Sequence, residues 1–122
     1  MRWEPIEESA LWELMNRAEA QMTAAQVRLW EAIRMPPVKW MQHPYGDVGG
    51  GFWAVAIIGT NVVWFNDIEG GFNISAYQTC GVIGDYWANQ DTLIQAVQRV
   101  LGVIVHGFDF GPFCGPPISI AR

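Results

Sequence analysis

The feature that most constrains the fold is a run of apolar segments and tight turns between residues 49 and 77, which reads GGGFWAVAIIGTNVVWFNDIEGGFNISAY. Phe52–Ile58 is apolar at successive positions, which is typical of a strand covered on both faces. The residues at 59–61 and 68–71 have the composition of tight turns. Connections this short exclude parallel crossovers, so the sequence predicts antiparallel strands at 52–58, 62–66 and 72–77.

Helical patterns lie on both sides of this run. Apolar residues recur every three or four positions between residues 5 and 22, and Thr23-Ala24-Ala25-Gln26 fits a capping box that would begin a second helix at Ala24–Arg34. One continuous helix over residues 5–34 is the alternative, and Pro36-Pro37 would end the helix in either case. Residues 92–105 predict a last helix, capped by Asn89 or Asp91.

Helices, then short strands, then a helix predict an α+β fold with an antiparallel sheet of three to five short strands. Val38–Gln42 and Thr79–Ile83 are the candidates for additional strands. A chain of 122 residues suits one domain, which we place at residues 1–107. Residues 108–122 are rich in Gly and Pro but contain three Phe, so we expect them to pack on the domain or on a neighbouring subunit.

The composition is unusually apolar. Hydrophobic residues make up 51% of the chain and charged residues only 16%, whereas an average globular protein has about 25% charged residues. Seven Trp residues add large apolar surfaces that suit cores, interfaces and ligand pockets. We therefore expect part of the apolar excess to lie in an interface, and we predict a homodimer.

Charge and cysteine content exclude several classes of function. The net charge is −5 and the Lys and Arg residues are scattered, so the basic stripe that nucleic acids or anionic membranes require is missing. No apolar run approaches the roughly 20 residues of a membrane span, and the N-terminal residues turn acidic without the apolar core of a secretory signal. Cys80 and Cys114 have no metal-type spacing, which favours a reducing cytoplasm, and we expect no metal and no cofactor.

The segment 72–77 alternates between apolar and polar residues. Asn73, Ser75 and Tyr77 should share one face of the strand, and we expect that face to be exposed to water. Tyr45 and Trp87 lie in predicted loops and would converge over it. Apolar walls with a few polar groups are typical of ligand pockets and of protein interfaces alike. The candidate binding face consists of Tyr45, Asp67, Glu69, Asn73, Tyr77 and Trp87.

Three titratable residues are candidates for chemistry. Asp67 and Glu69 are two positions apart at the end of a strand, where paired carboxylates can share acid–base work, although the same residue types also suit a tight turn. His43 is followed by Tyr45 and Asp47, so it resembles a base with an orienting carboxylate, but the nucleophile that such a base needs has no recognisable setting. A loop histidine bonded to backbone is the alternative interpretation.

Two other features favour structural roles. Gly49-Gly50-Gly51 precedes a strand rather than a helix, which favours a joint or a close backbone approach over a phosphate loop. Cys80 has no neighbouring base or cation in the sequence, so we expect a small buried hydrophobic residue.

The motifs GGGFW, WFNDIEGGFNIS and DYWANQDTL resemble those of small bacterial proteins without an assigned activity, over residues 5–105. The resemblance implies no catalytic residues. In size and acidity the chain is also similar to bacterial immunity proteins, which is a likeness of format alone. We predict a cytoplasmic binding module that uses an aromatic and acidic face to bind a protein partner or a small molecule. The alternative is a small enzyme with His43, Asp67 and Glu69 as acid–base residues.

Overall fold

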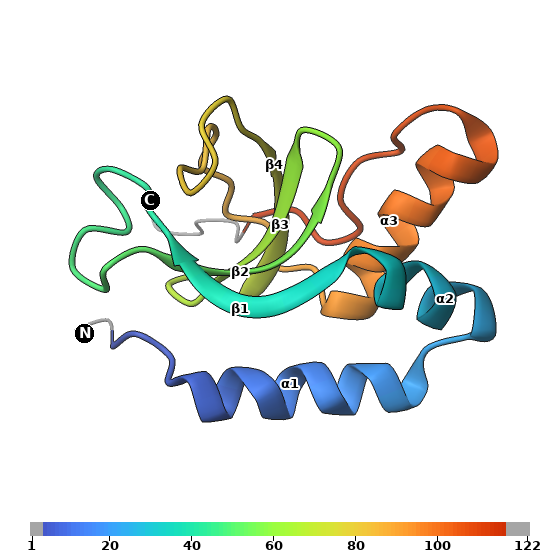
Figure 1. Ribbon diagram of the computed structural model, residues 1–122, viewed down its shortest axis with the longest axis horizontal. Coiled ribbons are helices and arrows are strands. Elements are labelled where there is room, and N and C mark those ends of the chain that lie inside the picture. Colours follow the sequence, from blue (N-terminus) through green and yellow to red (C-terminus); the bar gives the residue numbers. More distant parts are fainter. Residues whose placement is uncertain (1–3, 117–122) are drawn as a thin grey trace, which may run out of the picture.

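The computed structural model describes residues 4–116, which form three helices and a four-stranded antiparallel sheet (Figure 1). The α+β class predicted from the sequence is confirmed. The elements in chain order are α1 (Glu8–Gln21), α2 (Ala24–Ile33), β1 (Arg34–Trp40), β2 (Phe52–Ile58), β3 (Asn61–Asn66), β4 (Gly71–Ala76) and α3 (Leu93–His106).

Capping boxes begin both α2 and α3. The Thr23 hydroxyl accepts a hydrogen bond from the Gln26 N–H and the Gln26 side chain accepts one from the Thr23 N–H, so α1 and α2 are two separate helices. Thr92 and Gln95 form the same reciprocal pair at the start of α3. The expectation that Asn89 or Asp91 caps this helix is therefore wrong, because the threonine one position later completes a capping box.

One strand, β1, lies before the loop that contains Gly49-Gly50-Gly51. β1 begins directly after α2, so Pro36 and Pro37 lie within a strand, and the sheet order β1-β2-β3-β4 places that strand at an edge. Proline is tolerated there because an edge strand leaves half of its N–H groups unpaired. Thr79–Ile83 does not form a strand, and only a single parallel bridge joins Met41 to Val82.

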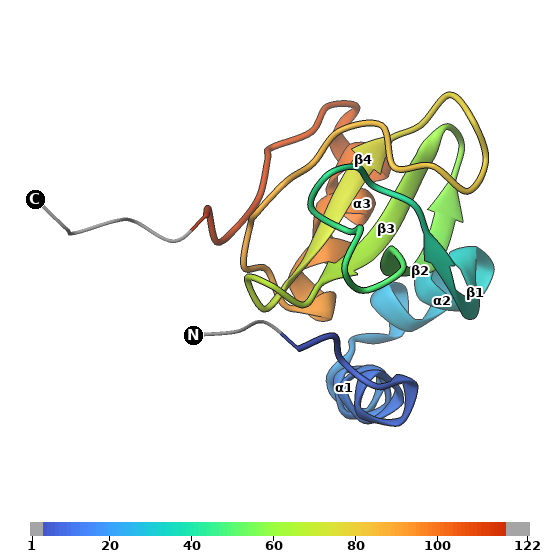
Figure 2. The ribbon, with the colours of Figure 1, turned by 90° about the vertical axis from the view of Figure 1, so that its left-hand side faces the viewer.

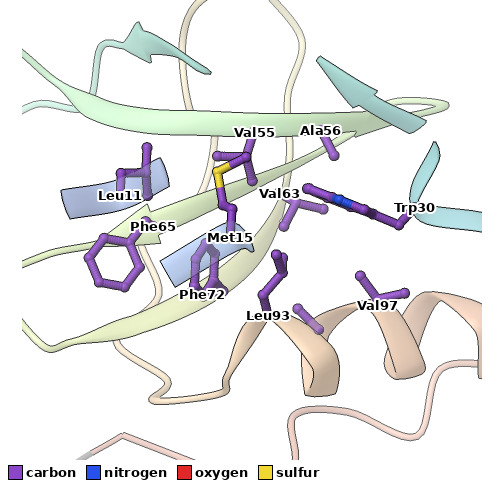
Figure 3. Close-up of a cluster of buried hydrophobic side chains, with 11 residues drawn as sticks. Leu11, Met15, Trp30, Val55, Ala56, Val63, Phe65, Phe72, Leu93 and Val97 are labelled. Carbon is purple, nitrogen blue, oxygen red and sulfur yellow. The ribbon is translucent and has the colours of Figure 1, made fainter. Parts of the chain in front are cut away.

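All three helices cover one face of the sheet (Figure 1). Met15 of α1 points toward Val55 of β2, while Leu93 and Val97 of α3 lie beside Trp30 of α2 (Figure 3). This helix-covered face has an apolar core whose sheet residues are Val55, Ala56, Val63, Phe65 and Phe72.

The opposite face of the sheet is covered by two loops, residues 41–51 and residues 77–92 (Figure 2). Its core contains Trp40, Phe52, Ala54, Val62, Trp64 and Ile83. The loops lie close to the strands, because a Cβ atom on Gly51 would be 2.3 Å from the Trp40 carbonyl oxygen and one on Gly71 would be 2.2 Å from the Asn89 carbonyl oxygen. For Gly51, the expected close backbone approach is confirmed.

Residues 107–116 form a C-terminal strap that turns back at Gly107 and runs along α3. Gly107 has a φ of +83°, which favours glycine, and ends the helix. Arg99 of α3 donates two hydrogen bonds to the Asp109 carboxylate at 2.8 and 2.7 Å. The Phe110 ring packs over Gly102, where the helix has no side chain. At the other end of the strap, the Asp91 carboxylate accepts the backbone N–H groups of residues 113 and 114. Residues 117–122 of the predicted tail lie outside the described residues.

Candidate functional site

The face of β4 that the sequence predicts to be exposed to water is buried. Asn73 and Ser75 are each only 1% exposed, because residues 84–91 of the 77–92 loop pack over them. The expectation of an exposed polar face is therefore wrong. Alternating polar residues usually indicate contact with water, but here they provide hydrogen bonds to a covering loop, which has no regular secondary structure of its own to satisfy its backbone.

Asn73 pairs with the loop backbone in both directions. Its side-chain oxygen accepts the Asn89 N–H at 3.0 Å, and its amide nitrogen donates to the Asn89 carbonyl at 3.1 Å. Ser75 acts one position further along the face. Its hydroxyl donates to the Asp85 carbonyl at 2.6 Å and accepts the indole N–H of Trp64 at 2.9 Å. The strand thus holds the loop at two points.

Asn66 connects the turn that carries Asp67 and Glu69, which we call the acidic turn, to the same loop. Its side chain is fully buried, and its oxygen accepts the backbone N–H groups of Ile68 and Glu69 at 3.0 and 3.2 Å. Its amide nitrogen donates to the Tyr86 hydroxyl at 3.0 Å and to the Trp87 carbonyl at 2.9 Å. One buried side chain therefore fixes the position of the acidic turn relative to both loop aromatics.

Above this junction, aromatic rings stack outward from the core. Phe52 and Trp64 are buried, Tyr86 lies about 6 Å from both rings, and Tyr45 stacks on Tyr86 with 4.1 Å between ring centroids and 22° between planes. Tyr45 is 51% exposed and Trp87 is 49% exposed. We call this surface the aromatic–acidic face, and it consists of Tyr45, Asp67, Glu69, Tyr86 and Trp87.

The acidic turn acts electrostatically on this stack. Burial raises the pKa of the Tyr86 hydroxyl, the hydrogen bond from Asn66 lowers it, and the negative charges of Glu69 and Asp67 raise it further, together with the neighbouring Tyr45. The field of both carboxylates thus reaches the centre of the face. A cation at this position would be attracted by the same field that opposes ionisation of the tyrosine.

Asp67 has a structural role as well. Its carboxylate accepts the backbone N–H of Ile6 at 2.6 Å, and the indole N–H of Trp53 donates to the Ile6 carbonyl at 3.2 Å, so the chain before α1 is tied to the sheet. Lys39 lies 4.9 Å from the centre of the Trp53 ring. Burial lowers the pKa of Lys39, and the charge of Asp67 partly offsets this effect. Glu69 is therefore the more available carboxylate for a ligand.

The interaction partners of His43 and Tyr77 lie outside the acidic turn. The Nδ1 atom of His43 lies 2.6 Å from the Asp47 carboxylate. Among residues 4–116, the ion pair of His43 is with Asp47 and involves neither Asp67 nor Glu69. Tyr77 follows the end of β4 that is opposite to the acidic turn, where it donates to the Gly59 carbonyl at 3.3 Å, and its ring packs edge-on against Trp40. The predicted acid–base set is not assembled by these contacts.

The candidate face predicted from the sequence does not include Tyr86, and Asn66 has no predicted role beyond the end of a strand. The available signal was the pair Tyr86-Trp87 in a loop, two adjacent aromatics that need burial or a partner. The position of Asn66 at the end of an otherwise apolar strand was the second signal, because a fully buried amide must find several partners.

Other possible sites lie elsewhere. A groove of about 450 Å³ runs between α1 and the start of α3, with Leu14, Phe65 and Leu93 among its walls. Both cysteines are free and exposed, so the expectation of a buried Cys80 is wrong; this residue lies in a turn of the loop rather than in a strand. Within the described part of the chain, no three His, Cys, Asp or Glu side chains gather as a metal site would require, and no helix has the length and apolar character to cross a membrane.

Comparison with known proteins adds no relative to this description. No family model matches the chain, and neither the curated proteins nor the solved structures contain a significant match. The functional argument therefore rests on the geometry of the aromatic–acidic face.

Proposed function

We propose that this chain is a binding module that recognises a partner protein through the aromatic–acidic face, with an arginine or lysine side chain of the partner as the group bound there. The observation that carries the proposal is the half-exposed stack of Tyr45 on Tyr86 beside the carboxylate of Glu69. Cations bind over aromatic faces with about 0.5–2 kcal/mol of stabilisation, and a nearby carboxylate adds a direct ion pair.

The shape of the face favours a macromolecular partner over a small molecule. Small-molecule sites usually bury about 70–90% of their ligand in a concave pocket. Here Tyr45 and Trp87 are each about half exposed, and Val48, on the same loop as Tyr45, is 81% exposed. Exposed tyrosine and tryptophan surrounded by smaller apolar residues are typical of the energetically dominant centre of a protein interface.

The alternative, a small enzyme, has less support. The short contact between His43 and Asp47 is the arrangement of a base and an orienting carboxylate, but it lies on an exposed loop. Asp67, one of its proposed partners, is engaged with the backbone of Ile6. A general base needs its proton donor within about 3 Å, and these contacts supply no such substrate position.

We also propose a cytoplasmic location for the protein. Cys80 and Cys114 are both exposed and free, which suits a reducing compartment, because exposed thiols in an oxidising one tend to form mixed disulfides.

The direct test is a titration of the ¹⁵N-labelled protein with Nα-acetyl-arginine amide, followed by NMR, with Nα-acetyl-citrulline amide as the uncharged control ligand. We expect the arginine compound to shift the amide signals of residues 45, 66–69 and 86–87 with a dissociation constant of about 1 mM, which is the affinity typical of such a fragment. The citrulline compound should shift them at least several-fold less at equal concentration.

Two matched variants locate the site. Glu69→Gln removes the available carboxylate of the face, whereas Glu31→Gln removes an exposed carboxylate of α2. We expect the first to weaken arginine binding at least threefold and the second to leave it unchanged. The proposal is wrong if both variants behave alike, or if the arginine compound causes no localised shifts.

A further inference from the structure

A second apolar surface lies at the end of α3, away from the acidic turn. We call it the α3 patch, and it consists of Val103, Ile104, Val105, Phe108 and Phe110, which are between 40% and 65% exposed. Phe108 and Phe110 contact each other edge to face at 4.5 Å, and Phe110 in turn lies over Gly102 of the helix. Val103, Ile104 and Val105 are successive residues of the last helical turn, so together with the strap they surround the end of α3.

We propose that the α3 patch is the surface through which two copies of this chain form a homodimer. The size of the patch is the first argument. With the exposed fractions above, its side chains present roughly 400–500 Å² of apolar surface. A standard interface covers about 800 Å² on each partner and is somewhat more than half apolar, so it needs roughly 450–500 Å² of this kind. The apolar area at this end of the molecule is thus comparable to that of one side of a standard interface.

Charge identifies a second copy as the occupant. The chain carries a net charge of −5, so two copies repel each other over most of their surface. Between residues 92 and 116 the only Asp, Glu, Lys or Arg residues are Arg99 and Asp109, and these two neutralise each other in a doubly hydrogen-bonded pair. The α3 patch is therefore the region where two identical acidic chains can approach with least repulsion, and it lacks the basic residues that would attract an anionic membrane.

Shape supports the same occupant. A two-fold interface uses the same patch on both copies, so the patch must contain both a protrusion and a recess. The protrusion is Phe108, which is 57% exposed. The recess is an adjoining cavity of about 160 Å³ that Val103 and Ile104 share with residues of the sheet and with the Arg99–Asp109 pair. In the proposed dimer, Phe108 of each copy enters the recess of the other.

Association through the edges of the sheet is hindered at both ends. β1 carries Pro36 and Pro37 at one edge, and these residues have no N–H to donate. At the other edge, the backbone of β4 is engaged by the loop, since Phe72 donates to the Asp91 carbonyl and the Ala76 carbonyl accepts the Gly84 N–H. The α3 patch is thus a more favourable contact than strand addition.

The test is sedimentation velocity over a concentration range of about 1–100 µM. We expect the unmodified chain to be a dimer at the upper end of this range. Ile104→Asp places a charge at the wall of the recess, and Val105→Asp provides a second variant with a different exposed position. Because both side chains are more than half exposed, the monomer should keep its fold, which circular dichroism checks. Each variant should weaken dimerisation at least tenfold.

The matched control is Val48→Asp, which adds the same charge at an exposed valine on the loop face. This variant should dimerise like the unmodified chain. A monomeric chain at 100 µM would overturn the proposal, and so would equal weakening by Val48→Asp. A monomer that instead floats with phosphatidylcholine vesicles would identify a lipid surface as the occupant and would overturn it as well. None of these results bears on arginine binding, which involves a different surface.

Discussion

The two faces of the sheet are stabilised in different ways. On the helix-covered face, the side chains that reach the core from α1, α2 and α3 are almost entirely apolar, because each helix satisfies its own backbone. On the loop-covered face, the strands surround an apolar core of similar kind with three buried polar side chains of their own, Asn66, Asn73 and Ser75. A loop needs partners for its backbone groups, and here the sheet supplies them.

This difference bears on function. On the first face, α1 presents a mainly polar outer surface. On the second face, the loop is held through the backbone of Asp85, Trp87 and Asn89, and this arrangement leaves the Trp87 side chain half exposed. The candidate binding face is therefore located where an ordered loop is fixed from below by buried amides. Loops positioned by a rigid scaffold are common locations for recognition.

The largest effect should come from the helix-covered core. Trp30 is 1% exposed, and Trp30→Ala should lower the free energy of unfolding by about 3–5 kcal/mol, because it leaves a large cavity between α2 and the sheet. Urea denaturation followed by far-UV circular dichroism measures the change. Trp87→Ala is the matched control on the loop-covered face, where a half-exposed ring should contribute less than about 1 kcal/mol. Similar losses in both variants would contradict the contrast between buried and presented tryptophans.

A smaller loss should come from the polar contacts of the loop. Asn73→Ala removes the side-chain hydrogen bonds to the N–H and the carbonyl of Asn89. It should lower the free energy of unfolding by about 1–3 kcal/mol. The control is Ile74→Val, the next residue of β4, which faces the helices and should lose about 0.5–1.5 kcal/mol. The same urea experiment measures both variants. A loss below about 0.5 kcal/mol for Asn73→Ala would show that the loop does not depend on this side chain.

The sequence predicted the helix-covered face much better than the loop-covered one. Periodicity and the capping box at Thr23 identified the helices, and tight turns identified three of the strands, because these signals are local. The burial of Asn73 is not local, since it depends on residues 84–91 folding back over the strand. Alternation alone cannot distinguish water from a covering loop. For the same reason Tyr86 was missed as a member of the candidate face.

The smallest effect concerns pH. Burial raises the pKa of Tyr86 above its ordinary value of 10.0, so the folded protein retains this proton at pH values where the unfolded chain has lost it. The contribution of Tyr86 to stability is therefore complete below pH 10 and is lost as the pH rises through the raised pKa. Absorbance at 295 nm should show a late ionisation step of Tyr86, displaced to a pH above its ordinary pKa of 10.0. In Tyr86→Phe, which also loses the hydrogen bond from Asn66 and about 0.5–1.5 kcal/mol at neutral pH, this late step should be absent.

The central claim is that the 77–92 loop is an ordered cover held by side chains of the sheet, and native-state hydrogen exchange tests it most directly. In the unmodified protein the Asn89 amide, which donates to Asn73, should be protected. In Asn73→Ala its protection should fall at least tenfold more than that of the Val100 amide in α3. An Asn89 amide that exchanges freely in the unmodified protein, or a uniform fall in both amides, would contradict the claim.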